Sequence, residues 1–222
     1  APAWAPLMAL ADKLVLRSTD GSAMTSFDVR IPGLRMTVVA ADGQNIHPVT
    51  VDEFRIAVAE TFDVIVEPAG QDAYTIFAQD TGRTGFARGT LALHAGLADA
   101  VPPLDARPIL TMGDMGHGGM DHGAMDHSGH DMPGMPGMPK HPASEAGNPL
   151  VDMQTMMPAP KLDDPGIGLR DNGRKVLTYA AMRSLFDDPD GREPGRELEL
   201  HLTGHMEKFA WSFNGQRFMD AA

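Results

Sequence analysis

The sequence predicts an all-β protein whose N-terminal half folds as an antiparallel β-sandwich or Greek-key barrel. Short runs of alternating apolar and polar residues recur at a spacing of roughly 10 residues between residues 24 and 94, which is typical of such folds. Pro32-Gly33 and Asp42-Gly43 end the first two runs, and both pairs are turn signals. No apolar stretch reaches about 18 residues, so we expect no membrane insertion.

The alternating runs predict a series of short strands. They span residues 24–33, 34–43, 51–60, 62–68, 73–79 and 89–95, and 12–18 is a further candidate. In the third run Phe54, Ile56 and Val58 share one face, because successive strand residues point to opposite sides of a sheet. We therefore expect these three side chains in the core, and Glu53 and Arg55 on the opposite face. Other residues that share a face of their strand are Phe62, Val64 and Val66, then Tyr74 and Ile76, then Leu91 and Leu93.

A different composition begins after residue 95. Pro, Gly, Ser and Asp are dense from here to residue 175, and such a chain neither sustains a helix nor buries enough apolar surface to stay ordered. We expect a flexible insert over residues 112–148 within this segment. The predicted division is a β domain over 1–110, with its first twenty residues less clearly part of it, an insert and linker over 111–175, and a further β domain over 176–222.

The last segment regains strand and turn patterns. Residues 178–186 are a candidate for two helical turns, 197–204 alternate as a strand, and 209–218 predict a hairpin with Asn214-Gly215 as its two-residue turn. Folded chains below about 40–50 residues usually need a metal, a disulfide or a partner. We therefore expect 176–222 to be the truncated beginning of a domain.

The net charge and the absence of cysteine exclude several classes of function. The 222 residues carry a formal net charge of −12, which argues against nucleic acid or an anionic membrane as a partner and suits cations. Because the chain contains no Cys, it has no disulfide, thiolate zinc site or cysteine nucleophile, and it cannot house a type 1 copper centre alone.

The segment 112–138, here called the Met/His run, carries the clearest chemical signal. It holds 7 of the 16 Met and 4 of the 9 His, together with four Asp and no Lys or Arg. Thioether sulfur is a soft donor that suits Cu(I), whereas imidazole binds Cu(II), Cu(I), zinc and nickel. The sequence therefore predicts a copper-collecting segment with several exchangeable sites. Its expected metal ligands are Met112, Met115, His117, Met120, His122, Met125, His127, His130, Met132, Met135 and Met138.

The alternatives to copper binding by the Met/His run are packing in a core, an inert linker, and a zinc or nickel tract. Packing in a core is disfavoured because Gly and Pro interrupt any helical or strand period. An inert low-complexity linker stays open, and a zinc or nickel tract would leave the seven Met without a role. Outside the run, His47 and His94 are expected to be surface or packing residues. His201 and His205 flank Leu-Thr-Gly in a strand and turn context, which favours a structural role, and no catalytic or cofactor-binding motif stands out.

Several segments together resemble one known family. Residues 22–68, which begin SAMTSFDVRIPG, and residues 74–92, YTIFAQDTGRTGFARGTLA, resemble the middle domain of bacterial copper-resistance multicopper oxidases of the copper-resistance protein A type. The Met-Asp-His insert and residues 148–179 and 199–218 resemble that family's linker and the start of its third domain. The resemblance implies a cupredoxin-like sandwich, a disordered Met/His-rich insert and an incomplete second cupredoxin domain.

The resemblance also implies a function. Such proteins are periplasmic, laccase-like enzymes that oxidise Cu(I) or phenols and reduce O2 to water, using a type 1 copper and a trinuclear copper cluster. The family's ligands are His-X-His pairs and a Cys flanked by His in the first and third domains, and this sequence contains neither motif. We therefore transfer no catalytic or cofactor-binding residue, and we expect those copper centres only in a full-length parent.

The expected contribution of this chain is scaffold and copper capture. Its partners are then copper ions and the first and third cupredoxin domains of the parent, and neither nucleic acid nor membrane is expected. A function of a different class stays open, namely a standalone periplasmic protein that binds or buffers copper without catalysis. Flanking His-X-His and His-Cys-His segments in a longer gene would favour the oxidase.

Overall fold

The computed structural model describes residues 13–111, 114, 141–152, 154, 160–187 and 190–220. Contacts divide the chain into two compact units. The first unit contains Ala1–Ile109 and Lys161–Pro189, and the second contains Leu110–Pro160 and Asp190–Ala222. The three-part division expected from the sequence stays a prediction, since these units are defined by contacts alone.

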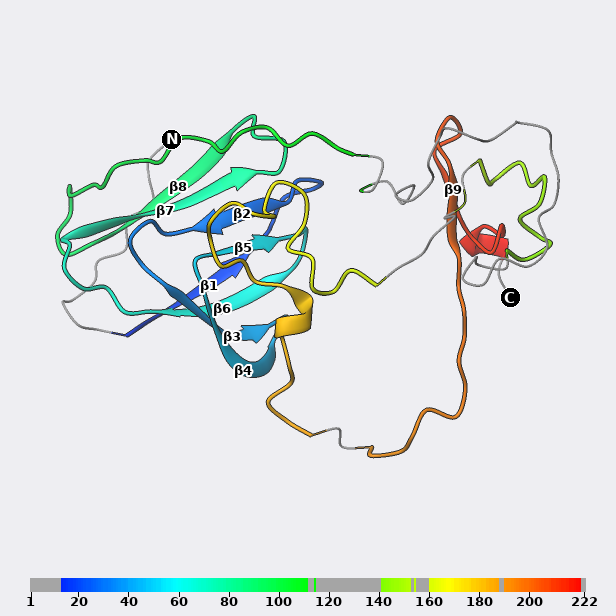
Figure 1. The fold of residues 1–222 in the computed structure, drawn as a ribbon, viewed down its shortest axis with the longest axis horizontal. Helices are drawn as coiled ribbons and strands as arrows, with labels where there is room; N and C mark the ends of the chain where they lie inside the picture. Colours follow the sequence, from blue (N-terminus) through cyan, green and yellow to red (C-terminus); the bar gives the residue numbers. More distant parts are fainter. Residues whose placement is uncertain are drawn as a thin grey trace. The chain divides into compact units, whose positions relative to one another are not determined.

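The first unit is built from two antiparallel four-stranded sheets (Figure 1). Its strands are β1 (Leu14–Thr19), β2 (Phe27–Arg30), β3 (Met36–Ala41), β4 (Gln44–Val51), β5 (Glu53–Ile56), β6 (Thr61–Val66), β7 (Ala73–Asp80) and β8 (Phe86–Ala92). One sheet has the order β1-β6-β3-β4 and the other β5-β2-β7-β8. The predicted all-β antiparallel architecture is confirmed, including the candidate strand near residues 12–18.

A single apolar cluster between the two sheets forms the core of the first unit. It takes Met36, Val38 and Val64 from one sheet and Phe54 and Tyr74 from the other, among further residues. All five side chains are almost fully buried. Because the cluster draws on both sheets, burial of its apolar surface holds them together as a sandwich.

One residue of the predicted core lies outside it. Phe54 and Ile56 are buried as expected, but Val58 is 40% exposed. The alternation fails at this point because β5 ends at Ile56 and the chain turns, with a positive φ of 67° at Ala59. The pattern of Phe62, Val64 and Val66 is confirmed, since all three side chains are buried.

The strand β4 had no counterpart in the sequence prediction. Pro48 lies within it, and proline lacks the N–H that a central strand needs. The structure accommodates Pro48 because β4 is the edge strand of its sheet, with β3 as its neighbouring strand. On the outer side, residues 183–185 bond to β4 only through Asn45 and His47, so no N–H is needed from Pro48. Asp42 and Gly43 join the two strands with φ values of 47° and 77°, so the predicted turn is confirmed.

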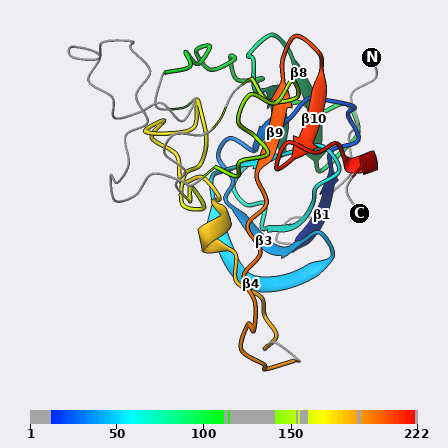
Figure 2. The same ribbon diagram turned by 90° about the vertical axis from the view of Figure 1, so that its right-hand side faces the viewer.

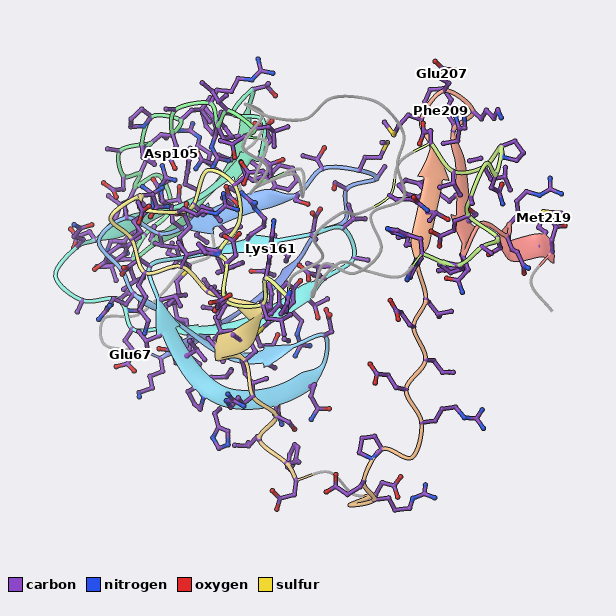
Figure 3. All side chains as sticks on the ribbon, turned by 45° about the vertical axis from the view of Figure 1, so that its right-hand side comes forward. Glu67, Asp105, Lys161, Glu207, Phe209 and Met219 are labelled. Atoms are coloured by element: carbon purple, nitrogen blue, oxygen red, sulfur yellow. The ribbon has the colours of Figure 1, made fainter. Side chains whose placement is uncertain are left out.

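The face of β5 that was expected to be polar is covered by other parts of the first unit. Glu53 has a fully buried side chain and accepts hydrogen bonds from Arg30 Nη1 at 3.0 Å and Arg174 Nε at 2.7 Å. Asp105 contacts the same two arginines. Burial alone would raise the pKa of Asp105, but the hydrogen bond from Gln79 and the two arginine charges hold it below its usual value. These ion pairs fasten the segments around residues 105 and 174 onto the sheet (Figure 3 labels Asp105).

The second unit contains the antiparallel hairpin of β9 (Leu202–His205) and β10 (Ala210–Phe213) (Figure 2). The predicted Asn214-Gly215 turn is confirmed, since these residues have φ values of 50° and 78°. The hairpin expected around it over 209–218 is wrong, because only the isolated bridge of Phe213 with Gln216 forms there and β10 pairs with β9 instead. A short 3-10 helix, η2 (Phe218–Asp220), follows. In Figure 3, Glu207 and Phe209 mark the turn between the strands and Met219 marks η2.

Two elements predicted between residues 176 and 222 are shorter than expected. Residues 178–186 contain only the 3-10 helix η1 (Tyr179–Ala181), in the first unit, instead of two helical turns. The strand expected over 197–204 begins only at Leu202, because residues 197–201 have no strand partner among the described residues. Among the described residues, no helix is long and apolar enough to cross a membrane.

Candidate metal centre

The metal ligands predicted from the sequence lie outside the described residues. All eleven belong to residues 112 and 115–140, whose placement the structure does not describe. Their role in copper binding therefore stays a prediction that rests on donor chemistry. The described residues hold a different group of potential ligands, within the second unit.

His141, Glu145 and His201 converge in the second unit. One potential ligand atom from each lies within 4.8 Å of the other two. His141 Nδ1 is 3.1 Å from Glu145 Oε2, and His201 Nδ1 is 2.9 Å from Glu145 Oε1. The two imidazole rings meet edge to face, with their centroids 5.4 Å apart. We call this group the His-Glu-His cluster.

Consecutive turns bring His141 and Glu145 together. Glu145 N donates to Pro142 O at 2.9 Å, and Asn148 N donates to Glu145 O at 3.2 Å. His141 and Glu145 are four residues apart, so a chain that turns in this way places both side chains on the same side. Glu145 becomes a fully buried carboxylate in this position.

The hairpin end holds the turn segment in place. Ser144 Oγ donates to Asn214 O at 2.8 Å, and Asn148 Nδ2 donates to Gly215 O at 2.8 Å. His201 N donates to Asn214 Oδ1 at 2.7 Å, which fixes the backbone of the third member of the cluster. The Asn214-Gly215 turn thus connects both segments that supply the cluster.

Further polar side chains orient the cluster. His201 Nε2 lies 2.8 Å from Glu199 Oε1, and Gln154 Nε2 donates to Glu145 Oε2 at 2.8 Å. The hydrogen bond with Glu199 raises the pKa of His201 above its ordinary value; burial opposes this, and the Glu145 carboxylate adds to it. Glu199 and Gln154 therefore fix how the ring of His201 and the carboxylate of Glu145 face each other.

Two buried atoms of the cluster have no hydrogen-bond partner among the described residues. They are Glu145 Oε1 and His141 Nε2. His201 Nδ1 is close enough to Glu145 Oε1 for a hydrogen bond, but the angles of the contact are not those of a hydrogen bond. A buried carboxylate oxygen without a hydrogen bond is costly, and a cation bound to Glu145 Oε1 would offset that cost.

The other described histidines do not join the cluster. His47 and His94 are exposed, as predicted from the sequence. His205 Nδ1 lies 3.6 Å from Asp152 Oδ2 and forms a separate pair.

Sequence reasoning missed the His-Glu-His cluster. His141 and Glu145 stand at the end of a segment rich in Pro and Gly, and Glu199 and His201 lie more than fifty residues later. The spacing of four residues between His141 and Glu145 was a usable signal. Nothing in the sequence indicated that the Asn214-Gly215 turn would meet this segment.

Comparison with known proteins gives the family. Residues 11–95 match the Multicopper oxidase family. Over 99% of its length the chain is 61% identical to "Copper resistance protein A" of Escherichia coli, and over 98% it is 62% identical to the "Copper resistance protein A homolog" of Pseudomonas syringae pv. tomato. The chain belongs to the copper-resistance protein A type of multicopper oxidases. Copper is the cofactor of this family, and the sandwich of the first unit is cupredoxin-like.

The chain corresponds to part of its multicopper oxidase relatives. It spans 43% of the length of the Escherichia coli protein and 41% of that of the Pseudomonas syringae homologue. A solved laccase structure, from Botrytis aclada, is similar over 48% of this chain and 21% of its own, with 22% identity and a TM-score of 0.42. The family assignment rests on the two sequence matches.

The donor set of this chain does not fit the resident copper centres of a multicopper oxidase. A type 1 centre needs a Cys thiolate, and the chain has no Cys. His-X-His pairs are also absent from the sequence. The His-Glu-His cluster offers two imidazoles and one carboxylate, which is a different donor set.

Proposed function

We propose that this chain is the scaffold and copper-collecting part of a periplasmic copper-resistance multicopper oxidase. The parent enzyme oxidises Cu(I) or phenols and reduces O2 to water at copper centres outside this chain. In this proposal the first unit corresponds to a middle domain, and residues 176–222 belong to the start of a third domain. The missing first and third domains are the protein partners, and copper ions are the cargo.

The proposal rests on the Met/His run. On both sides of this run the chain matches a copper-resistance protein. Seven thioethers and four imidazoles supply soft and borderline donors, so the run offers ligands for copper in either oxidation state. Four Asp and the net charge of −12 favour the approach of a cation. The run thus supplies copper close to an oxidising enzyme.

Replacing Met by Leu in the run tests the copper-collecting role. A variant with Met120, Met125, Met132, Met135 and Met138 all changed to Leu keeps apolar side chains of similar size but loses the sulfur donors. We expect the amount of Cu(I) bound to fall by roughly half or more, because Cu(I) prefers sulfur ligands. Competition against a chromophoric Cu(I) chelator measures it.

The matched control changes methionines outside the run. Met24, Met206 and Met219 are exposed, so Leu in their place leaves the packing intact. This control should bind as much Cu(I) as the unchanged chain. Equal Cu(I) binding by the five-residue variant, or an equal loss in the control, would show that the run does not collect Cu(I) through its methionines.

A further inference from the structure

We propose that His141, Glu145 and His201 form a binding site for a divalent transition-metal cation, with Cu(II) bound most tightly. The site lies in the second unit and uses none of the residues of the Met/His run. It goes beyond the proposed function, because it holds the oxidised ion and contains no sulfur donor.

The spacing of the donor atoms suits one cation. Zinc and similar ions bind imidazole nitrogen and carboxylate oxygen at about 2.0–2.2 Å, so two ligands of one tetrahedral ion lie about 3.4 Å apart. The nitrogen–oxygen separations in the cluster are 3.1 Å and 2.9 Å. Small outward shifts of the rings therefore make room for an ion between both imidazoles and the carboxylate.

The hydrogen-bond pattern of His201 supports a cation between the rings and Glu145. Glu199 Oε1 is only an acceptor, so His201 Nε2 carries a proton in their 2.8 Å contact. Nδ1 is then the ring nitrogen left for a metal ion, and it lies 2.9 Å from Glu145 Oε1, the carboxylate oxygen that has no hydrogen bond. A cation bound to both atoms would satisfy this buried oxygen.

The surroundings match those of known metal sites. A metal-ligating histidine usually donates its other N–H to a carboxylate, and ligating carboxylates are themselves hydrogen-bonded. Glu199 occupies the first of these positions beside His201, and Gln154 occupies the second beside Glu145. Glu145 is fully buried, and its Oε1 is directed into the cluster without a hydrogen-bond partner among the described residues.

The donor set selects the ion. Two neutral imidazoles and one carboxylate suit Cu(II), nickel, cobalt and zinc, and the Irving–Williams order puts Cu(II) first. Cu(I) prefers sulfur, which the cluster lacks. The cluster would then give the chain a Cu(II) site that contains no sulfur, in addition to the mixed donors of the Met/His run.

Cu(II) binding tests the site in a full chain whose run has lost its imidazoles. In this background His117, His122, His127 and His130 are changed to Gln, so that the run competes poorly for Cu(II). We expect one Cu(II) ion with the nitrogen superhyperfine splitting of imidazole in its electron paramagnetic resonance spectrum. Changing His141, Glu145 or His201 to Gln in that background should remove this signal and weaken binding, measured by competition with glycine.

A milder variant guards against loss of folding. Glu199 is 73% exposed on its side chain and contacts the ring of His201, so Glu199→Gln is expected to leave the fold intact. It should weaken Cu(II) binding by about tenfold. Loss of a group that hydrogen-bonds a metal ligand lowers the metal affinity by about 10- to 100-fold, and an exposed group is expected at the lower end. His47→Gln and His94→Gln, which change exposed histidines of the first unit, should leave the Cu(II) affinity unchanged.

Two results would overturn the proposal. One is a background chain whose bound Cu(II) shows no imidazole nitrogen splitting. The other is a Cu(II) affinity that Glu199→Gln and the three ligand variants leave as high as in the background. Neither result bears on Cu(I) binding by the Met/His run, so failure of this site is distinguishable from failure of the proposed function.

Discussion

Glu53 shows how far a single residue can depart from the strand pattern around it. The alternation of β5 puts the side chain of Glu53 on the face opposite Phe54, where a charged residue is expected to be exposed to solvent. The structure buries it completely beneath Arg30 and Arg174. Arg174 lies 121 positions away in the chain, so no local pattern in the sequence announces this partner.

Replacing Glu53 with Gln should destabilise the first unit strongly. The substitution keeps the size of the side chain but removes one of the two carboxylates that compensate Arg30 and Arg174, and this one is fully buried. Breaking a buried ion pair in this way costs about 3 kcal/mol or more in unfolding free energy. Urea unfolding followed by circular dichroism measures the loss.

The matched control is Glu67→Gln. Glu67 pairs with Lys13 at 2.9 Å, but both side chains are mostly exposed. An exposed pair contributes about 0–1 kcal/mol, so this change should shift the unfolding midpoint little. If Glu53→Gln and Glu67→Gln have the same effect, the buried network does not stabilise the unit as described.

At the scale of elements, the Asn214-Gly215 turn decides the shape of the second unit. Gly215 has a φ of 78°, and a Cβ at this position would lie 2.6 Å from Asn148 Nδ2 and 2.7 Å from Ser144 O. These atoms belong to the segment that carries Glu145. The glycine is therefore needed both for the backbone conformation and for the close approach of that segment.

Gly215→Ala should loosen the contact between the turn and residues 141–152. Strain at a left-handed non-glycine residue costs about 1–3 kcal/mol, and the clash with backbone adds to it. Hydrogen exchange of the amides of Glu145, Asn148 and Val151 should become faster. Gly195→Ala is the control, since no atom lies within 4 Å of its added Cβ and its φ is not left-handed. Equal exchange in both variants would contradict the role of Gly215.

The sequence predicted the elements where one simple pattern dominates. The alternation in β6 and the Asp42-Gly43 and Asn214-Gly215 turns are local features, and the structure agrees with all three. It missed β4, because Pro48 argues against a strand unless the strand lies at an edge. The sequence also predicted too much helix over residues 178–186, where only η1 forms. The residues of η1 are not buried, so no packed apolar face stabilises a longer helix.

At the scale of the whole molecule, fold class and family were predictable, and the site was predictable only in part. The strand runs and the quoted segments indicated a cupredoxin-like multicopper oxidase, and the relatives confirm it. The Met/His run was recognisable from its unusual composition alone, without any three-dimensional information. The His-Glu-His cluster was missed because it assembles residues 141, 145 and 201 through contacts between distant segments.

The central claim is that this chain collects copper without oxidase activity of its own. Its most direct test is Cu(I) titration of the purified chain against a competing chromophoric ligand, alongside a phenol-oxidase assay in air with added copper. We expect several exchangeable Cu(I) ions and no turnover. Absence of Cu(I) binding would contradict the copper-collecting role, and turnover would contradict the placement of the oxidase copper centres outside this chain.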